Sequence, residues 1–274
     1  MLRKTAKRSY SSSNEKLNDK FLTGSSNLGK IEMKTQHIFD SPPSVSIIVP
    51  TFNEEKYIVS CLKSLKHQTY RGKYEIIVAD GGSKDRTIDL AKKIADKIIV
   101  CDSSVGTARN YGAKASSGEI LAFIDSDTVA SPNWLSAIVE AMSIKDVVCV
   151  GGLTLPLGGS KMDYFLYKLA SRKILKYSIT LGIPMVPGFN CAYRRAPFFK
   201  IGGFDERRVL SEDTMLSLTI QRLGKIVYKE KMLAYTSIRR IKAQGHFHML
   251  LLHTFNGLIT LFFGRSLSKY PVIR

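Results

Sequence analysis

The sequence has few cysteines, a single tryptophan and no long uninterrupted apolar run. The four cysteines among 274 residues stand far apart, without a Cys-x-x-Cys pair. That spacing excludes a zinc ribbon and a disulfide scaffold, and it indicates buried thiols in a reducing compartment. A mean hydropathy of −0.04 excludes a polytopic membrane protein. Because no apolar core follows the basic N-terminus, we expect no signal peptide and a cytoplasmic protein, soluble or peripheral on the inner face of the cell membrane.

Acidic residues are also scarce. The chain has 23 Asp and Glu against 41 Lys and Arg, which gives a net charge of +18. A charge of this size indicates an anionic partner: a nucleic acid, a membrane or a phosphorylated substrate. No aromatic RNA-binding motif and no block of consecutive basic residues is present. We therefore favour a membrane or a phosphorylated substrate.

Composition divides the chain near residue 44. Residues 1–43 are rich in Ser, Asn and Lys, and they cannot bury enough apolar surface to offset the entropy of ordering, so we predict a disordered basic tail. Beyond it, short β-branched runs alternate with helical patterns, which predicts βαβ units and a parallel sheet. Expected strands lie at 45–50, 74–80, 97–101, 119–125 and 147–152, and expected helices at 58–65, 85–95, 105–115 and 132–142.

Polar residues directly follow three of the expected strands. The first ends in Pro50-Thr51-Phe52-Asn53-Glu54-Glu55, the second in Asp80-Gly81-Gly82-Ser83 and the fourth in Asp125-Ser126-Asp127. In an open parallel sheet the carboxyl ends of the strands meet at one edge, where ligands bind. Each cluster alone is typical of a capped turn. Three acidic clusters at one edge favour a divalent cation together with an anionic ligand.

These segments, taken in order, resemble family 2 glycosyltransferases with the GT-A fold. They are Val-Pro-Thr-Phe-Asn-Glu-Glu at 49–55, Ile-Val-Ala-Asp-Gly-Gly-Ser-Lys-Asp-Arg-Thr at 77–87, Gly-x-x-Arg-Asn-x-Gly at 106–112 and Phe-Ile-Asp-Ser-Asp at 123–127. The match extends over residues 44–240. It implies an α/β fold with a Rossmann-like, mostly parallel sheet flanked by helices. The nucleotide-binding half would be 44–130 and the acceptor-side α+β half 131–240.

The resemblance implies a nucleotide-diphosphate sugar, linked to UDP or GDP, as the donor. Asp80 would contact the base or ribose, and Arg109 would help to hold the nucleotide. Asp125 and Asp127 form the family's Asp-x-Asp motif, and Asp127 would be the direct ligand of Mn²⁺ or Mg²⁺. Such cations are held by one or two carboxylates plus phosphate oxygens, and they neutralise a leaving diphosphate. The nucleotide pocket would be lined by Pro50, Thr51, Phe52 and Glu54.

Motifs in the second half also resemble the family. The segment 187–195, with Asn190, looks like the family's segment beneath the donor sugar. The segment 201–206 looks like its Gly-Gly-Phe-Asp turn. Glu212 and Asp213 look like its Glu-Asp motif at the start of a helix, although they also fit a simple helix start. By resemblance Asp213 is the base that takes the proton of the acceptor hydroxyl in one inverting displacement, and Glu212 is its neighbour or an acceptor contact.

Two further features bear on the reaction. The family's processive members have a Gln-x-x-Arg-Trp motif, which residues 221–224 do not match, and the only tryptophan is Trp134. We therefore expect transfer of a single sugar rather than polymer synthesis. Arg239 and Arg240 resemble the basic loop that approaches the donor diphosphate in relatives.

Two basic, apolar segments indicate a membrane surface. Residues 164–181 mix Lys and Arg with Phe, Leu and Ile, as do helices that lie on anionic bilayers. Residues 246–264 are mostly apolar but marginal for a spanning helix, which needs ~20 residues. We expect a C-terminal helix within 241–274 that packs on the domain or lies at the membrane interface, and His246 or His248 is a weaker metal candidate. The acceptor is then a polyprenyl phosphate or another lipid-linked glycan.

Two other classes stay open at this point. A sugar nucleotidyltransferase also uses a Rossmann-like sheet with paired Asp, but it usually has a glycine-rich basic loop after the first strand, where residues 50–56 are acidic and free of glycine. A dehydrogenase would need Gly-x-Gly-x-x-Gly there. A non-catalytic basic protein that binds nucleic acid or membrane would show steeply salt-dependent binding to nucleic acid. We expect no nucleic-acid partner.

Overall fold

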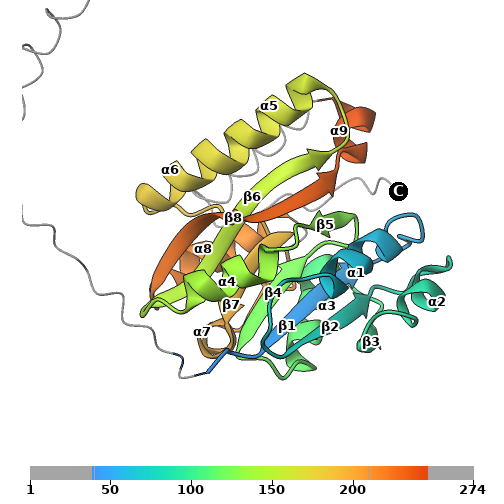
Figure 1. Ribbon diagram of the computed structural model, residues 1–274, viewed down its shortest axis with the longest axis horizontal. Coiled ribbons are helices and arrows are strands. Elements are labelled where there is room, and N and C mark those ends of the chain that lie inside the picture. Colours follow the sequence, from blue (N-terminus) through green and yellow to red (C-terminus); the bar gives the residue numbers. More distant parts are fainter. Residues whose placement is uncertain (1–38, 40, 209, 246–274) are drawn as a thin grey trace, which may run out of the picture. The chain divides into compact units, whose positions relative to one another are not determined.

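An eight-stranded mixed sheet forms the framework of the domain in the computed structural model, which describes residue 39, residues 41–208 and residues 210–245. The strand order is β3-β2-β1-β4-β7-β6-β8-β5 (Figure 1). The strands are β1 (Val45–Thr51), β2 (Tyr74–Asp80), β3 (Lys97–Val100), β4 (Ile120–Ile124), β5 (Thr128–Ala130), β6 (Val147–Leu157), β7 (Asn190–Arg194) and β8 (Lys225–Ser237).

The first four strands are parallel, and β1 lies between β2 and β4. In this register Thr51 pairs with Asp80, so the last residues of β1 and β2 lie side by side. β7 is antiparallel to both β4 and β6, whereas β8 is parallel to β6 and antiparallel to β5. The carboxyl ends of β1, β2 and β4 therefore meet at one edge, and β7 joins the two predicted halves in a single sheet.

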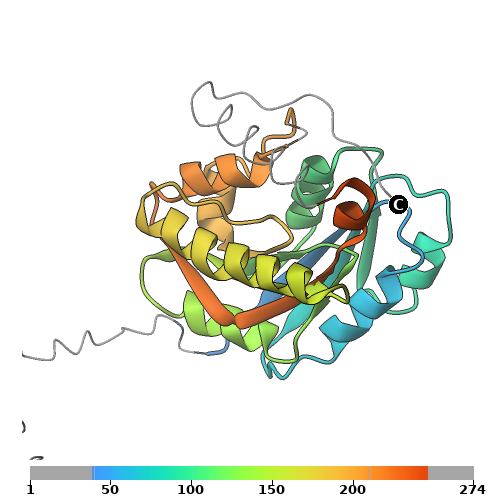
Figure 2. The same cartoon turned by 90° about the horizontal axis from the view of Figure 1, so that it is seen from above.

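Helices cover both faces of this sheet. α1 and α4 pack on one face, and α3, α7 and α8 pack on the other. α5, η1 and α6 follow one another without a break along β6 and β8 (Figures 1 and 2). The helices are α1 (Ile58–Lys66), α2 (Thr87–Ala91), α3 (Val105–Lys114), α4 (Trp134–Met142), α5 (Lys161–Leu169), the π-helix η1 (Ala170–Ile174), α6 (Leu175–Thr180), α7 (Arg195–Lys200), α8 (Glu212–Ile220) and α9 (Arg239–Gln244).

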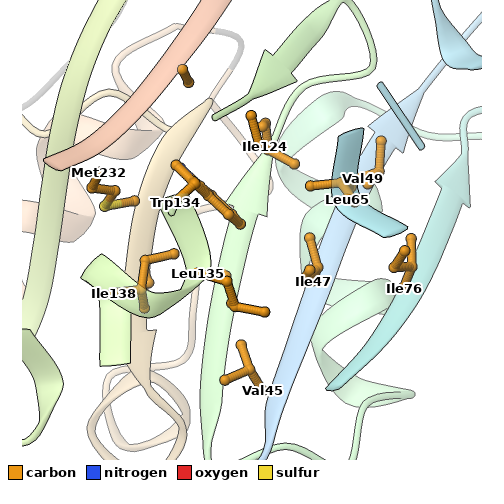
Figure 3. Packing of buried hydrophobic residues seen from close by; sticks show 14 of the residues in the cluster. Val45, Ile47, Val49, Leu65, Ile76, Ile124, Trp134, Leu135, Ile138 and Met232 are labelled. Carbon is orange, nitrogen blue, oxygen red and sulfur yellow. The ribbon is translucent and has the colours of Figure 1, made fainter. Parts of the chain in front are cut away.

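The alternation of side chains along β1 divides the core into two layers. Ile47 and Val49 belong to the layer beneath α1 and α4, whereas Ile48 belongs to the layer beneath α3. Figure 3 shows the first layer, where Trp134 and Ile138 of α4 pack beside the strands. Because helices cover both faces of the sheet, the sequences of its central strands are continuous apolar runs, as expected for a buried parallel sheet.

Several sequence-based boundaries change in the structure. The expected helix at 85–95 is only α2, Thr87–Ala91. The end of the predicted tail contacts the domain, since Phe39 packs against the core and the Pro43 carbonyl accepts a 2.5 Å hydrogen bond from Tyr70. Residues 1–38 and 246–274, with His246 and His248, lie outside the described residues. Among the helices of the described ranges none is long and apolar enough to cross a membrane, and the four cysteines form no disulfide.

Candidate active site

Arg109 on α3 joins two of the predicted motifs. Its Nη2 donates a 2.8 Å hydrogen bond to Asp125 at the end of β4, and its Nη1 donates one of 2.9 Å to Glu212 at the start of α8. The residue is 3% exposed. Burial favours the neutral form, but Asp125 and Glu212 outweigh it and raise the pKa of Arg109, so the guanidinium stays charged. The Asp-x-Asp and Glu-Asp motifs therefore meet at one buried cation.

The glycines around Arg109 leave room for these contacts. A Cβ on Gly188 would lie 2.8 Å from Arg109 Nη1, and a Cβ on Gly106 would lie 3.6 Å from Glu212 Cγ. One helical turn after Arg109, a Cβ on Gly112 would lie 2.5 Å from Ile48 of β1. Gly112 thus lets α3 approach the sheet closely, whereas the distance at Gly106 is an ordinary contact.

Asn110, the next residue of the same motif, fixes the Gly-Gly-Phe-Asp turn. Its side chain accepts a hydrogen bond from Phe204 N (2.9 Å) and donates to Phe204 O (2.8 Å) and to Glu206 (2.9 Å). Asn110 belongs to the 106–112 motif, but its place in the sequence indicated no role. Its contacts hold the turn that precedes α8, and hence the position of Glu212.

A second cation, the half-buried Arg239, joins the segment after β1 to the Asp-x-Asp motif. Its guanidinium donates hydrogen bonds to both carboxylate oxygens of Glu54, from Nη1 at 2.6 Å and also from Nη2, and Nη2 lies 3.2 Å from Asp127 Oδ2. The Tyr57 ring lies beneath it, 4.9 Å from Cζ to the ring centroid. The sequence indicated no role for Tyr57, because only the fold brings residues 57 and 239 together. Arg239, expected at a diphosphate, thus pairs with two carboxylates of the site.

Burial and neighbouring charges perturb two carboxylates here. Burial, then Asp125 and Glu54, raise the pKa of Asp127 to about 6, and Arg239 and Arg240 oppose this. Burial and the adjacent Asp213 raise the pKa of Glu212, and Arg109 offsets this only in part. Buried carboxylates with pKa values shifted by their neighbours in this way are typical of functional sites.

The two carboxylates of the Glu-Asp motif have different partners. Glu212 faces Arg109, whereas Asp213 accepts a 2.9 Å hydrogen bond from Gly188 N and a 2.7 Å bond from Thr214 N. Ser211, directly before them, has a left-handed φ of 59°, and Asn53, directly before Glu54, has a φ of 53°. Non-glycine residues adopt this conformation at a cost, and they concentrate at functional sites.

The end of β1 supplies a second group of predicted residues. Pro50 and Thr51 are buried and Phe52 is half-buried. The Thr51 hydroxyl is buried and has no hydrogen-bond partner among the residues that the structure describes. An orphaned buried hydroxyl is unusual, and it suits a site that a polar ligand completes. A pocket beside Glu54 is lined by Asn53, Glu54, Glu55, Lys56, Tyr57, Asp85 and Arg239.

Asp80 is fully buried, and its carboxylate caps its own turn. It accepts hydrogen bonds from Gly82 N (2.9 Å), Ser83 N (2.7 Å) and Ser83 Oγ (2.5 Å). The capped-turn interpretation therefore describes its contacts in the protein alone, and contact with a base or ribose stays a prediction.

Asn190, expected beneath a donor sugar, makes its contacts within the core of the protein, and the sugar contact stays a prediction. It is fully buried, accepts a 2.8 Å hydrogen bond from Trp134 Nε1, and donates to Leu153 O (3.0 Å) and Thr154 Oγ1 (3.1 Å). These bonds join β7, α4 and β6. Both the oxygen and the nitrogen of its side-chain amide are therefore hydrogen-bonded within the core.

The carboxylates of the site fit a hard divalent cation. Within the described ranges no three His, Cys, Asp or Glu side chains form a group that could hold a metal by themselves. Asp125 and Asp127 do provide oxygen ligands near one another, with side chains 33% and 16% exposed. Mn²⁺ or Mg²⁺ is commonly held by one or two carboxylates completed by substrate phosphates. These two residues fit that mode and not an all-protein cage.

Comparison with known proteins identifies the family. The model of Glycosyl transferase family 2 matches residues 46–202, more than half of the chain. The chain belongs to glycosyltransferase family 2. Membership of this family favours sugar transfer over the nucleotidyltransferase and the non-catalytic alternatives.

Curated relatives of this glycosyltransferase include two from Haloferax volcanii. Glycosyltransferase AglE is 38% identical over 134 residues, which cover 45% of this chain and 44% of that protein. A glucosyl-dolichyl phosphate glucuronosyltransferase is 28% identical over 174 residues, which cover 59% and 56%. The match thus spans about half of each relative's length.

Solved structures confirm the GT-A fold of this family 2 glycosyltransferase. A mannosyltransferase from Pyrobaculum calidifontis, in complex with GDP-Man and Mn²⁺, superposes with a TM-score of 0.66 at 20% identity, over 82% of this chain and 64% of that one. TarS from S. aureus in complex with UDP-GlcNAc gives 0.57 at 19% identity, over 80% and 73%. The predicted fold class is therefore correct.

Proposed function

We propose that this glycosyltransferase moves a single sugar from a UDP- or GDP-linked donor to an acceptor hydroxyl or phosphate, with inversion and with Mn²⁺ or Mg²⁺. The observation that carries the proposal is the pairing of Arg109 with both Asp125 and Glu212. It brings the acidic motif expected at the diphosphate and the acidic motif expected at the acceptor to opposite ends of one guanidinium. The solved relatives that contain GDP-Man or UDP-GlcNAc support the class of donor.

At the donor end, Asp125 and Asp127 would hold the cation together with the diphosphate. When bound, the cation would supply positive charge to the leaving diphosphate. Arg239 and Arg240 would add further positive charge there, once Arg239 exchanges its contacts with Glu54 and Asp127 for phosphate oxygens. Thr51, whose hydroxyl is unpaired among the described residues, would face the nucleotide together with Pro50 and Phe52.

At the acceptor end, Asp213 would act as the general base. The acceptor oxygen forms a bond to the anomeric carbon while the bond from that carbon to the diphosphate breaks. The electron pair leaves with the diphosphate, and the proton of an acceptor hydroxyl passes to Asp213. The hydrogen bond from Gly188 N would orient this carboxylate, and Arg109 would hold Glu212 beside it.

The acceptor that we propose is a polyprenyl phosphate or another lipid-linked glycan. The relative named a glucosyl-dolichyl phosphate glucuronosyltransferase supports a lipid-linked acceptor. The absence of the processive motif at 221–224 supports the transfer of a single sugar.

Thermal unfolding tests the donor and the cation first. Wild type, Asp127→Ala and the exposed control Asp89→Ala are each heated with UDP, GDP or neither, with and without Mn²⁺. A ligand at a hundred times its Kd adds ~2.7 kcal/mol of stability. We expect one diphosphate to raise the Tm of wild type and of Asp89→Ala only when Mn²⁺ is present, and not to raise that of Asp127→Ala. If neither nucleotide shifts wild type, the proposal fails.

Asp213→Asn tests the base separately. We expect kcat for a hydroxyl acceptor to fall by about 10²–10⁴-fold while the nucleotide-dependent Tm shift is retained. NMR of the product gives the anomeric configuration. A retained configuration contradicts the single displacement, and full activity of Asp213→Asn contradicts the assigned base.

A further inference from the structure

Exposed apolar side chains concentrate on one segment of the domain. The structure describes fourteen large apolar side chains that are exposed, and ten of them lie between residues 157 and 185. Solvent-exposed apolar residues scattered singly are ordinary, whereas a contiguous cluster marks an interaction surface. The ten are Leu157, Met162, Tyr164, Phe165, Leu169, Ile174, Tyr177, Leu181, Ile183 and Met185.

The centre of this cluster is a single helical rod made of α5, η1 and α6. A capping box of Ser160 and Asp163 starts it, and Gly182, with a φ of 73°, follows its end. Only Asp163, Leu175 and Ser178 of the rod are buried, so most of its surface faces away from the domain. Figure 2 shows the rod lying over β6 and β8, with its outer side uncovered by other described elements.

The π-helix keeps the apolar side chains of the rod in one stripe. Helical neighbours on one face are three or four residues apart, and Met162, Phe165 and Leu169 have this spacing, as do Ile174, Tyr177 and Leu181. Ile174 follows Leu169 by five positions, one more than the usual step. The wider turn of η1, where the hydrogen bonds run from i to i+5, absorbs the extra residue. Without η1 the two halves of the stripe would face different directions.

Exposed basic residues accompany the stripe along the whole rod. Lys161, Lys168, Arg172, Lys173 and Lys176 are all exposed, and the only acid between residues 157 and 185 is the buried Asp163. Arg172 has a half-exposed ion pair with Glu230 at 3.5 Å. The rod thus presents apolar and cationic side chains together, with almost no compensating acid of its own.

The positive charge of the rod favours an anionic partner for this surface. Residues 246–274 contain Arg265, Lys269 and Arg274 but no Asp or Glu, and a second copy of the chain has a net charge of +18. Neither would neutralise the cations of the rod. An anionic lipid bilayer accepts apolar side chains beneath its headgroups and attracts Lys and Arg at its surface.

We propose that the α5–η1–α6 rod docks this protein on an anionic membrane, with the apolar stripe at the headgroup level. The rod continues into the loop that contains Gly188, whose backbone N–H bonds Asp213. Docking would therefore bring this side of the site to the lipid surface, where a lipid-linked acceptor resides. The docking itself does not depend on the proposed reaction.

Vesicle sedimentation of the full chain tests the docking. Vesicles of phosphatidylcholine alone are compared with vesicles that also contain phosphatidylglycerol, at low and at high salt. We expect wild type to bind only the anionic vesicles and to be released by salt. Replacing Lys168, Lys173 and Lys176 by Gln should lower the partition coefficient by about a hundredfold. The control, Lys92→Gln with Lys93→Gln at two exposed positions directly after α2, should bind almost as wild type does.

Fluorescence provides a second readout that does not require loss of binding. The only native tryptophan, Trp134, is fully buried, so an added tryptophan reports its own surroundings. We expect the emission of Phe165→Trp to shift to the blue on anionic vesicles and that of Tyr111→Trp, exposed outside the rod, to stay unchanged. Docking by the rod is refuted if wild type does not bind anionic vesicles or if the Lys variant binds them as tightly as wild type does. It is also refuted if the emission of Phe165→Trp does not shift to the blue on these vesicles. Nucleotide-dependent Tm shifts in the same variants report the donor site separately.

Discussion

Arg239 lies 3.2 Å from Asp127, so the carboxylate proposed as the cation ligand is already paired with a positive charge in the protein alone. The same guanidinium bonds both oxygens of Glu54, 185 residues away in sequence. If Asp125 and Asp127 hold a divalent cation, Asp127 no longer needs Arg239 to neutralise its charge. Arg239 would then be free to turn toward the diphosphate while Glu54 stays behind it.

The ion pair between Arg239 and Glu54 should contribute measurably to stability. Glu54 is 3% exposed, and Arg239→Ala would leave its carboxylate buried without this partner. We expect the free energy of unfolding in urea to fall by about 3 kcal/mol. Lys242→Ala, exposed on the same helix, should change it by less than about 0.5 kcal/mol. Equal stability of the two variants would show that the pair contributes nothing.

The raised pKa of Glu212 predicts how stability depends on pH. Since its folded pKa exceeds the ordinary value of 4.5, its contribution to stability is complete below that pH and is lost as the pH rises toward the folded pKa. We expect the unfolding free energy to fall above pH 4.5 less steeply in Glu212→Gln than in wild type. Urea unfolding at a series of pH values measures both slopes, with the exposed Asp89→Asn as control. Parallel slopes for wild type and Glu212→Gln would contradict the shift.

Asn110 should stabilise the turn before α8. Asn110→Ala removes three hydrogen bonds and leaves the Phe204 backbone N–H and carbonyl without this partner. We expect a loss of about 2–3 kcal/mol in the unfolding free energy, together with lower kcat, because the turn leads into Glu212 and Asp213. Asn133→Ala, at an exposed position, is the matched control. An Asn110→Ala protein as stable as this control would refute the role of the turn.

The variant Asn190→Ala tests whether this side chain serves the core or contacts the donor. Asn190→Ala would leave the indole N–H of Trp134 buried and unpaired, at a cost of about 1–3 kcal/mol. We expect a lower Tm and an unchanged KM for the donor at a temperature where the variant is folded. A raised donor KM with wild-type Tm would instead restore the contact expected from the sequence.

The sequence alone was enough to predict the fold class and most of the polar residues at the carboxyl edge of the sheet. Buried parallel strands are continuous apolar runs, and the turns after them have their own residue chemistry, so both signals are local. The motifs also indicated that Arg109, Asp125 and Glu212 belong to one site. The structure adds that Arg109 bonds both carboxylates.

Other features depend on contacts that no local pattern encodes. Asn190 is a core residue because β7 is inserted antiparallel between β4 and β6, which brings it beneath Trp134. Arg239 meets Glu54 only because the chain returns past β1 after β8. Helical spacing in the sequence also does not reveal the extra residue that η1 absorbs. Hydrophobic periodicity therefore determined which elements form, whereas the order and direction of strands distant in sequence decided which polar side chains meet.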